Sequence, residues 1–194
     1  MERKVFKREV NKEIFSNSKA EATGIYQICE RGNIINNTNS RYVVLDTEIT
    51  FAGATKQNGA DMLLYDIKEC ELLFVKVKHW SDKEIQPKTL LNGTETLEIL
   101  EQIGRYNSEI ETRKEEILSA YEKYVQNIND TYNMNMPMPK SVNQKCGLVI
   151  WGQNSIQREQ LKEAVYPYLD SKVKYYAIGN PKEIDISTLY ESLK

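Results

Sequence analysis

The stretch ADMLLYDIKECELLFVKVKHW, residues 60–80, decides the fold. It holds two apolar runs, Asp61 to Tyr65 and Leu72 to Trp80, with a short polar segment between them. Short runs of this kind, bounded by turn formers, are typical of strands. The connection is too short for a crossover helix, so the two strands must pair antiparallel. Because a third run, Tyr42 to Phe51, precedes them, the sequence predicts an antiparallel meander of three strands.

The period of the apolar residues changes from two to three or four after this meander. This helical pattern of apolar residues is interrupted only at Arg113. It predicts one helix of about 35 residues that begins at Thr94. Asn92-Gly93-Thr94 supplies the turn and the N-cap that would begin it. The apolar positions are Ile99, Ile103, Tyr106, Ile110, Ile117, Tyr121, Tyr124 and Ile128.

Residues 131–145 carry two prolines and several polar turn formers, which predicts a linker loop. The continuous apolar run Cys146 to Trp151 then predicts a strand buried on both faces. An amphipathic helix from Ser155 to Leu169 and a strand from Val173 to Ile178 follow, and Pro181 to Lys194 predicts a short helix. The chain after the linker is therefore expected to be a strand-helix-strand unit.

The N-terminal residues predict an amphipathic helix, which Ser16-Asn17-Ser18 would interrupt. Residues 20–30 fit a helix or a strand equally, and residues 31–41 predict a loop. We therefore expect one α/β domain with a mixed sheet, residues 1–194. Residues 1–130 hold the first helix, the meander and the long helix, residues 131–145 the linker, and residues 146–194 the rest of the same domain.

Charge is nearly balanced, with 26 Lys and Arg against 28 Asp and Glu. This balance excludes the global positive field of sequence-independent nucleic-acid binders, so any such contact must be local. Lys76, Lys78, His79, Lys83 and Lys88 lie within thirteen positions. They form either a solvated strand end or a phosphate-binding track, and the sequence leaves both open.

The cysteines Cys29, Cys70 and Cys146 are widely spaced and odd in number, so we expect reduced thiols. No apolar run has the length of a signal peptide or of a membrane span, so we expect a cytoplasmic protein without membrane contact. His79 is the sole histidine, which excludes histidine-based triads and predicts packing beside Trp80.

An acid and two lysines are expected at one edge of the meander. Side chains two apart on a strand share a face, so Lys76 and Lys78 project together. The hairpin between the second and third strands brings Asp61 near them. The sequence therefore predicts an acid-plus-lysine site at this edge of the sheet.

Residues 42–106 resemble the core of the PD-(D/E)xK nuclease superfamily, which has a restriction-endonuclease-like fold. That family carries an Asp on the second core strand, a Glu-x-Lys on the third, and in one branch a Gln-x-x-x-Tyr on the following helix. Here Asp61, Lys78, and Gln102 with Tyr106 match these motifs. The resemblance implies that these four residues are catalytic, with Glu48, or else Glu30, as the completing acid.

Lys76 departs from this pattern, because the family has a metal-binding Glu at that position. A magnesium ion needs anionic oxygen ligands, which an ammonium cannot supply. The resemblance therefore implies a nuclease-like protein with impaired catalysis that binds nucleic acid or a partner. Alternatively, Glu48 and Asp61 together bind Mg²⁺ and the protein is an active nuclease.

The long helix permits a third function, because its apolar residues fit the seam of a coiled coil. At 1.5 Å per residue the helix would be about 50 Å long, more than the width of such a domain. We therefore expect its far half, from Glu115 to Asp130, to pack on the C-terminal strand-helix-strand unit or on a second copy. The third alternative is thus an assembly or adaptor domain, a homodimer or a binder of a partner helix.

Overall fold

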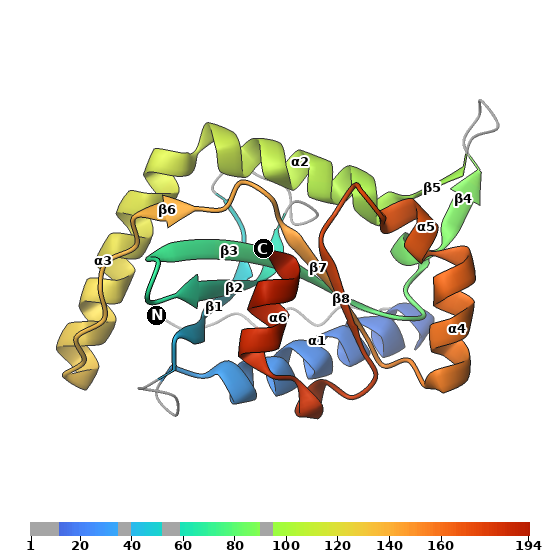
Figure 1. Ribbon diagram of the computed structural model, residues 1–194, viewed down its shortest axis with the longest axis horizontal. Coiled ribbons are helices and arrows are strands. Elements are labelled where there is room, and N and C mark those ends of the chain that lie inside the picture. The colour runs from blue at the N-terminus through green and yellow to red at the C-terminus, as the bar shows by residue number, and fades with distance from the viewer. Residues whose placement is uncertain (1–11, 35–39, 52–58, 90–94) are drawn as a thin grey trace.

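The computed structural model describes residues 12–34, 40–51, 59–89 and 95–194. A mixed β-sheet forms the centre, with helices on both of its faces (Figure 1). The α/β class predicted from the sequence is confirmed.

The first three strands form the predicted antiparallel meander. Two further strands extend the sheet in parallel with the third, and the strand order is β1-β2-β3-β7-β8. The five strands are β1 (Tyr42–Ile49), β2 (Ala60–Asp66), β3 (Glu71–His79), β7 (Gly147–Trp151) and β8 (Tyr175–Ile178). A two-residue strand, β6 (Ser141–Val142), also pairs with the beginning of β3.

The side chains on the two faces of β3 pack in two separate hydrophobic cores. Leu72 and Phe74 belong to the core on one face, whereas Leu73, Val75 and Val77 belong to the core on the other. This division follows from the alternation of side chains along a strand. Because Lys76 and Lys78 are in step with Phe74, they point to the face that Phe74 occupies.

The N-terminal helix α1 (Lys12–Gly32) is continuous. The predicted interruption at Ser16-Asn17-Ser18 is wrong, and residues 20–30 adopt the helical alternative. Gly24 lies against the Trp151 ring, where an added Cβ would come within 2.3 Å of the indole. The absence of a side chain at this position lets the helix approach the sheet closely.

The long helix of the sequence prediction is two helices, α2 (Glu98–Thr112) and α3 (Lys114–Tyr132). Arg113 joins them with φ −106° and ψ 16°, outside the helical range. This break falls at the one position where the apolar pattern fails. The expectation of a single helix is therefore wrong, because the chain bends there to keep both apolar stripes on the sheet.

The helix also begins later than the sequence predicts. Residues 95–97 form strand β5 (Glu95–Leu97), which pairs with β4 (Pro87–Thr89) in a small second sheet. Leu97 therefore holds the N-cap position of α2, without a capping hydrogen bond from its side chain. The predicted cap, Asn92-Gly93-Thr94, lies outside the described residues.

Helix α3 packs against the edge of the sheet and the linker. Tyr121 Oη donates a hydrogen bond to Asp46 Oδ2 at 2.9 Å. Asn129 holds Met136 with two hydrogen bonds, to its carbonyl oxygen and from its amide. Helices α4 and α5 lie at the other end of the molecule (Figure 1). The far half of the helical region thus contacts β1 and the linker instead of the C-terminal unit.

The C-terminal unit follows the predicted strand-helix-strand order. The predicted helix from Ser155 to Leu169 is divided at Val165, just before Pro167. Its two parts are α4 (Ser155–Ala164) and α5 (Tyr166–Leu169), and the final elements are η3 (Pro181–Glu183) and α6 (Ile186–Leu193). None of the helices within the described ranges is long and apolar enough to cross a membrane.

Candidate acid–lysine site

The predicted site residues come from three elements. Asp61 is the second residue of β2, and Lys76 and Lys78 lie near the end of β3. Gln102 and Tyr106 are buried residues of α2, the helix that covers this face of the sheet. The two lysines are also buried, with exposed fractions of 8% and 7%.

The Asp61 carboxylate uses both of its oxygens within the protein. Lys76 Nζ lies 3.2 Å from Oδ1, and the Val77 amide donates to Oδ2 at 2.6 Å. Lys76 Nζ also donates to the carbonyl oxygen of Gly59 at 2.8 Å. A carboxylate and a carbonyl are the kind of oxygen donors that a hard divalent cation selects. The ammonium therefore takes the ligands that a metal ion would need.

Lys78 is paired with acids of the segment that follows β3. Its Nζ lies 2.8 Å from Glu84 Oε2 and 3.8 Å from Asp82 Oδ2. Both acids belong to the short 3-10 helix η2 (Lys83–Ile85) or its cap, and Asp82 accepts a hydrogen bond from the Glu84 amide at 2.9 Å. This hydrogen bond of Asp82 thus fixes the turn that places Glu84 next to Lys78.

The charge of Glu84 is stabilised by its neighbours. Burial by itself would raise the pKa of this carboxyl. The neighbouring Lys78 ammonium, 2.8 Å away, together with Gln102, outweighs burial and holds the pKa below its usual value. Glu84 therefore links Lys78 on β3 to Gln102 on α2.

Tyr106 is held by aromatic neighbours beside Asp61. Its ring stacks on Phe51 with centroids 5.2 Å apart and meets the edge of Phe74 at 5.6 Å. Burial raises the pKa of the Tyr106 phenol, and the nearby Asp61 charge acts in the same direction. The phenol consequently stays protonated and can serve only as a neutral hydrogen-bonding group.

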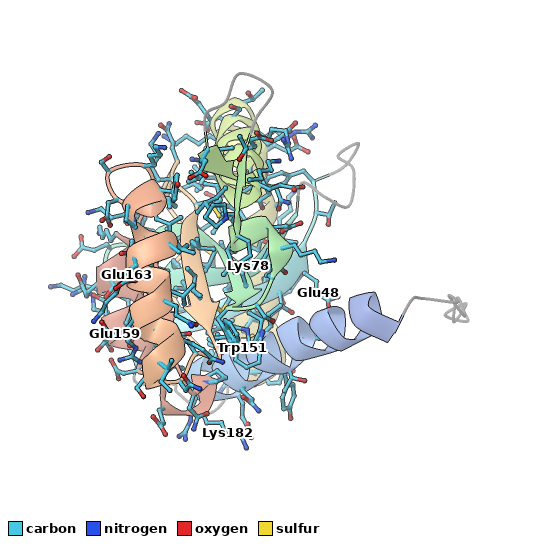
Figure 2. All side chains as sticks on the ribbon, turned by 90° about the vertical axis from the view of Figure 1, so that its right-hand side faces the viewer. Glu48, Lys78, Trp151, Glu159, Glu163 and Lys182 are labelled. Carbon is cyan, nitrogen blue, oxygen red and sulfur yellow. The ribbon has the colours of Figure 1, made fainter. Side chains whose placement is uncertain are left out.

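The structure does not join Glu48 to Asp61. Residues 47 and 49 pair with residues 62 and 60, which places Glu48 opposite Asp61 along the backbone. However, Glu48 has a left-handed conformation with φ 55° and lines a cavity of about 300 Å³ together with residues of α1. Figure 2 shows Glu48 just above α1, with Lys78 farther from that helix. Glu30 is exposed on α1.

The site does not fit a magnesium ion bound by two acids. Within the described ranges, no three His, Cys, Asp or Glu side chains gather as a metal-binding group. Asp61 forms the ion pair with the Lys76 ammonium, and Asp82 and Glu84 form ion pairs with Lys78. Among the described residues, the arrangement is an interior network of paired charges that can fix hydrogen-bond donors.

The basic residues of the β3 region differ in their exposure and in their partners. Lys76 and Lys78 are buried and paired, and Lys88 lies 3.5 Å from Glu98. His79 packs edge-on against Trp151 at 4.8 Å, as well as beside Trp80 at 5.9 Å. Its burial lowers the pKa, so the imidazole is neutral near pH 7. Lys83, by contrast, is exposed.

The sequence analysis assigned no role to Asp82 and Glu84, which the structure pairs with Lys78. The available signal was their spacing of four and six residues after Lys78, at a Ser-Asp turn that can fold back on the strand. That signal is weak, because the spacing by itself does not say whether the turn folds back toward the lysine.

No model of a known protein family matches this sequence, and no curated protein matches it. The fold and the site thus define an α/β protein with a mixed sheet and a buried acid–lysine network.

Proposed function

We propose that this chain is a PD-(D/E)xK nuclease-like protein that binds nucleic acid without cleaving it. The order of elements supports the kinship, since an antiparallel meander is followed by a helix and a parallel strand. Asp61 on the second strand, Lys78 on the third, and Gln102 on the next helix face the same side of the sheet. This shared placement supports the proposal.

One observation supports the proposed absence of cleavage. Lys76 Nζ lies 3.2 Å from Asp61 Oδ1 and 2.8 Å from the Gly59 carbonyl oxygen. Two unit charges 4 Å apart repel by about 4 kcal/mol at an effective dielectric constant of 20. A divalent ion beside this ammonium would meet roughly twice that repulsion. Magnesium binding, and the activated water that a metal ion supplies, are thereby disfavoured.

Lys76→Glu tests this proposal directly. The substitution replaces the ammonium with the carboxylate that the family pattern contains, so we expect Mg²⁺ binding by calorimetry and Mg²⁺-dependent cleavage of DNA or RNA. The natural chain should show neither, while it binds labelled nucleic acid in a gel-shift assay.

Lys123→Glu is the matched control, because it makes the same change of charge at an exposed position of α3. It should leave both metal binding and cleavage as in the natural chain. Mg²⁺-dependent cleavage by the natural chain that disappears in Asp61→Ala would contradict the proposal and favour the active nuclease. Failure of the natural chain to bind any nucleic acid would also contradict it.

Most of the apolar stripe of the helices is buried within the chain, although Tyr124 is 40% exposed, and this burial disfavours assembly through a helical seam. Ile103, Ile110, Ile117 and Tyr121 are buried in the core between α2, α3 and the sheet. A residue that is buried against its own sheet cannot form a coiled-coil seam with a second copy. We therefore do not propose a homodimer or an adaptor through this stripe.

A further inference from the structure

A cavity of about 340 Å³ lies at the edge of the sheet where β7 and β8 begin. Five of its seven lining residues have a polar or basic side chain. The lining residues are Asn107, Lys145, Cys146, Ser171, Lys172, Val173 and Lys174.

The parallel pairing of β7 and β8 brings these lysines together from distant parts of the sequence. Lys145 precedes β7 by two residues and Lys174 directly precedes β8. The Leu148 amide donates to the Lys174 carbonyl at 3.0 Å, which fixes the two strand starts side by side. Lys172 belongs to the turn between α5 and β8, which lies against α2 in Figure 1.

These lysines differ from those of the acid–lysine site because their charges face solvent. Lys145, Lys172 and Lys174 are all exposed. No lining residue of the cavity is acidic, and within the described ranges no ion pair joins any of the three to a carboxylate. Three like charges around one cavity repel each other, so an anion placed among them is stabilised.

The floor of the cavity adds neutral polar groups. Asn107 Oδ1 accepts a hydrogen bond from the Cys146 amide at 2.7 Å, which ties α2 to the start of β7. Asn107 also lines the cavity, and its side-chain amide carries Nδ2 donors as well as this acceptor. Burial raises the pKa of the Cys146 thiol to about 12, so the thiol adds no negative charge.

The cavity adjoins the acid–lysine site. Asn107 follows Tyr106 directly on α2, and the charges of Lys76 and Asp61 both act on the Cys146 thiol. A polyanion bound at the cavity would therefore lie beside the residues that carry the nuclease resemblance.

We propose that Lys145, Lys172 and Lys174 bind the phosphate backbone of a nucleic-acid strand. This inference rests on the proposed function and names the surface through which nucleic acid binds. Lys76 and Lys78 are paired inside the protein, whereas these three lysines are exposed and form no ion pair with a carboxylate of the described residues. Phosphate contacts of this kind do not depend on base sequence.

The test measures binding of a fluorescein-labelled 20-nucleotide DNA, single-stranded and as a duplex, over a series of salt concentrations. Three phosphate contacts contribute about 2 to 3 to the slope of log Kobs against log salt. The contribution of these three contacts to the binding constant therefore falls about 20- to 40-fold between 50 and 200 mM salt. We expect the triple variant Lys145→Ala, Lys172→Ala, Lys174→Ala to lose this part of the slope and to bind at least about tenfold more weakly at 50 mM salt.

The matched control removes three exposed lysines elsewhere, Lys123, Lys162 and Lys182, and should keep the slope of the natural chain. All six lysines are exposed, so neither variant should fail to fold.

Equal loss of binding in the control variant, or an unchanged slope in the cavity variant, would overturn the inference while the proposed function stands. If the natural chain itself binds no nucleic acid, both the inference and the proposed function are overturned. A natural chain that binds inorganic pyrophosphate but neither form of the DNA would reduce the cavity to a small-anion site and overturn the inference.

Discussion

Removal of the Asp61 carboxylate tests how the buried charges depend on each other. In Asp61→Ala, the Lys76 ammonium retains only the Gly59 carbonyl among its two described partners, and the Val77 amide loses its acceptor. The side chains of Lys76 and Asp61 are 9% and 19% exposed, so water compensates only in part.

Breaking a buried ion pair by removing one partner costs about 3–5 kcal/mol. The partial exposure of Asp61 places this variant near the lower end, at about 3 kcal/mol. With an m-value of about 2 kcal/mol/M in urea, the midpoint of unfolding should fall by about 1.5 M. The fluorescence of Trp80 and Trp151 reports the transition.

A second substitution shows how much of the lost stability comes from the unpaired Lys76 charge and how much from lost packing. Lys76→Met keeps most of the buried aliphatic stem and removes the ammonium, so adding it to Asp61→Ala should restore at least about 1 kcal/mol. Asp61→Asn should be milder than Asp61→Ala, since the amide oxygen can still accept from Val77. A urea midpoint for Asp61→Ala within about 0.2 M of the natural chain would refute this reasoning. So would a double variant less stable than the single one.

Two other predictions concern the end of β3 and the contact with α1. Burial lowers the pKa of His79, so the unfolded chain binds more protons than the folded chain as pH falls below about 6.5. The urea midpoint should therefore fall between pH 7.5 and 5.5, and the fall should be smaller in His79→Gln. Gly24→Ala should destabilise the protein by about 1–3 kcal/mol, because the new methyl group overlaps the Trp151 ring. A shifted Trp emission spectrum would accompany it, whereas unchanged stability and emission would contradict the close packing of α1.

Short apolar runs, together with the alternation of side chains along a strand, were enough to predict the three strands of the meander and their antiparallel pairing. The runs from Tyr42, Asp61 and Leu72 are joined by connections too short for anything but antiparallel pairing. The same alternation put Lys76 and Lys78 on one face, where they are found. Local patterns of this kind depend on neighbours in the chain, so a single sequence contains them.

Backbone breaks within helices were harder to predict, because their cause lies partly outside the helix. At Arg113 the apolar pattern fails for one position, which a straight helix could also tolerate. The bend places Tyr121 against Asp46 and Asn129 against Met136. The first contact joins segments that are far apart in the sequence, and the second depends on the path of the linker. Neither can be predicted from the helix alone.

The sequence by itself determined the α/β class, the meander and the side of the sheet on which Asp61, Lys76 and Lys78 stand. Only the tertiary structure decided their partners: Glu84 returns to Lys78, whereas Glu48 is turned toward α1. It also gathered three lysines around one cavity at the start of β7 and β8. The physical reason is that periodicity fixes which way a side chain points, while the charge it meets depends on how remote segments fold back.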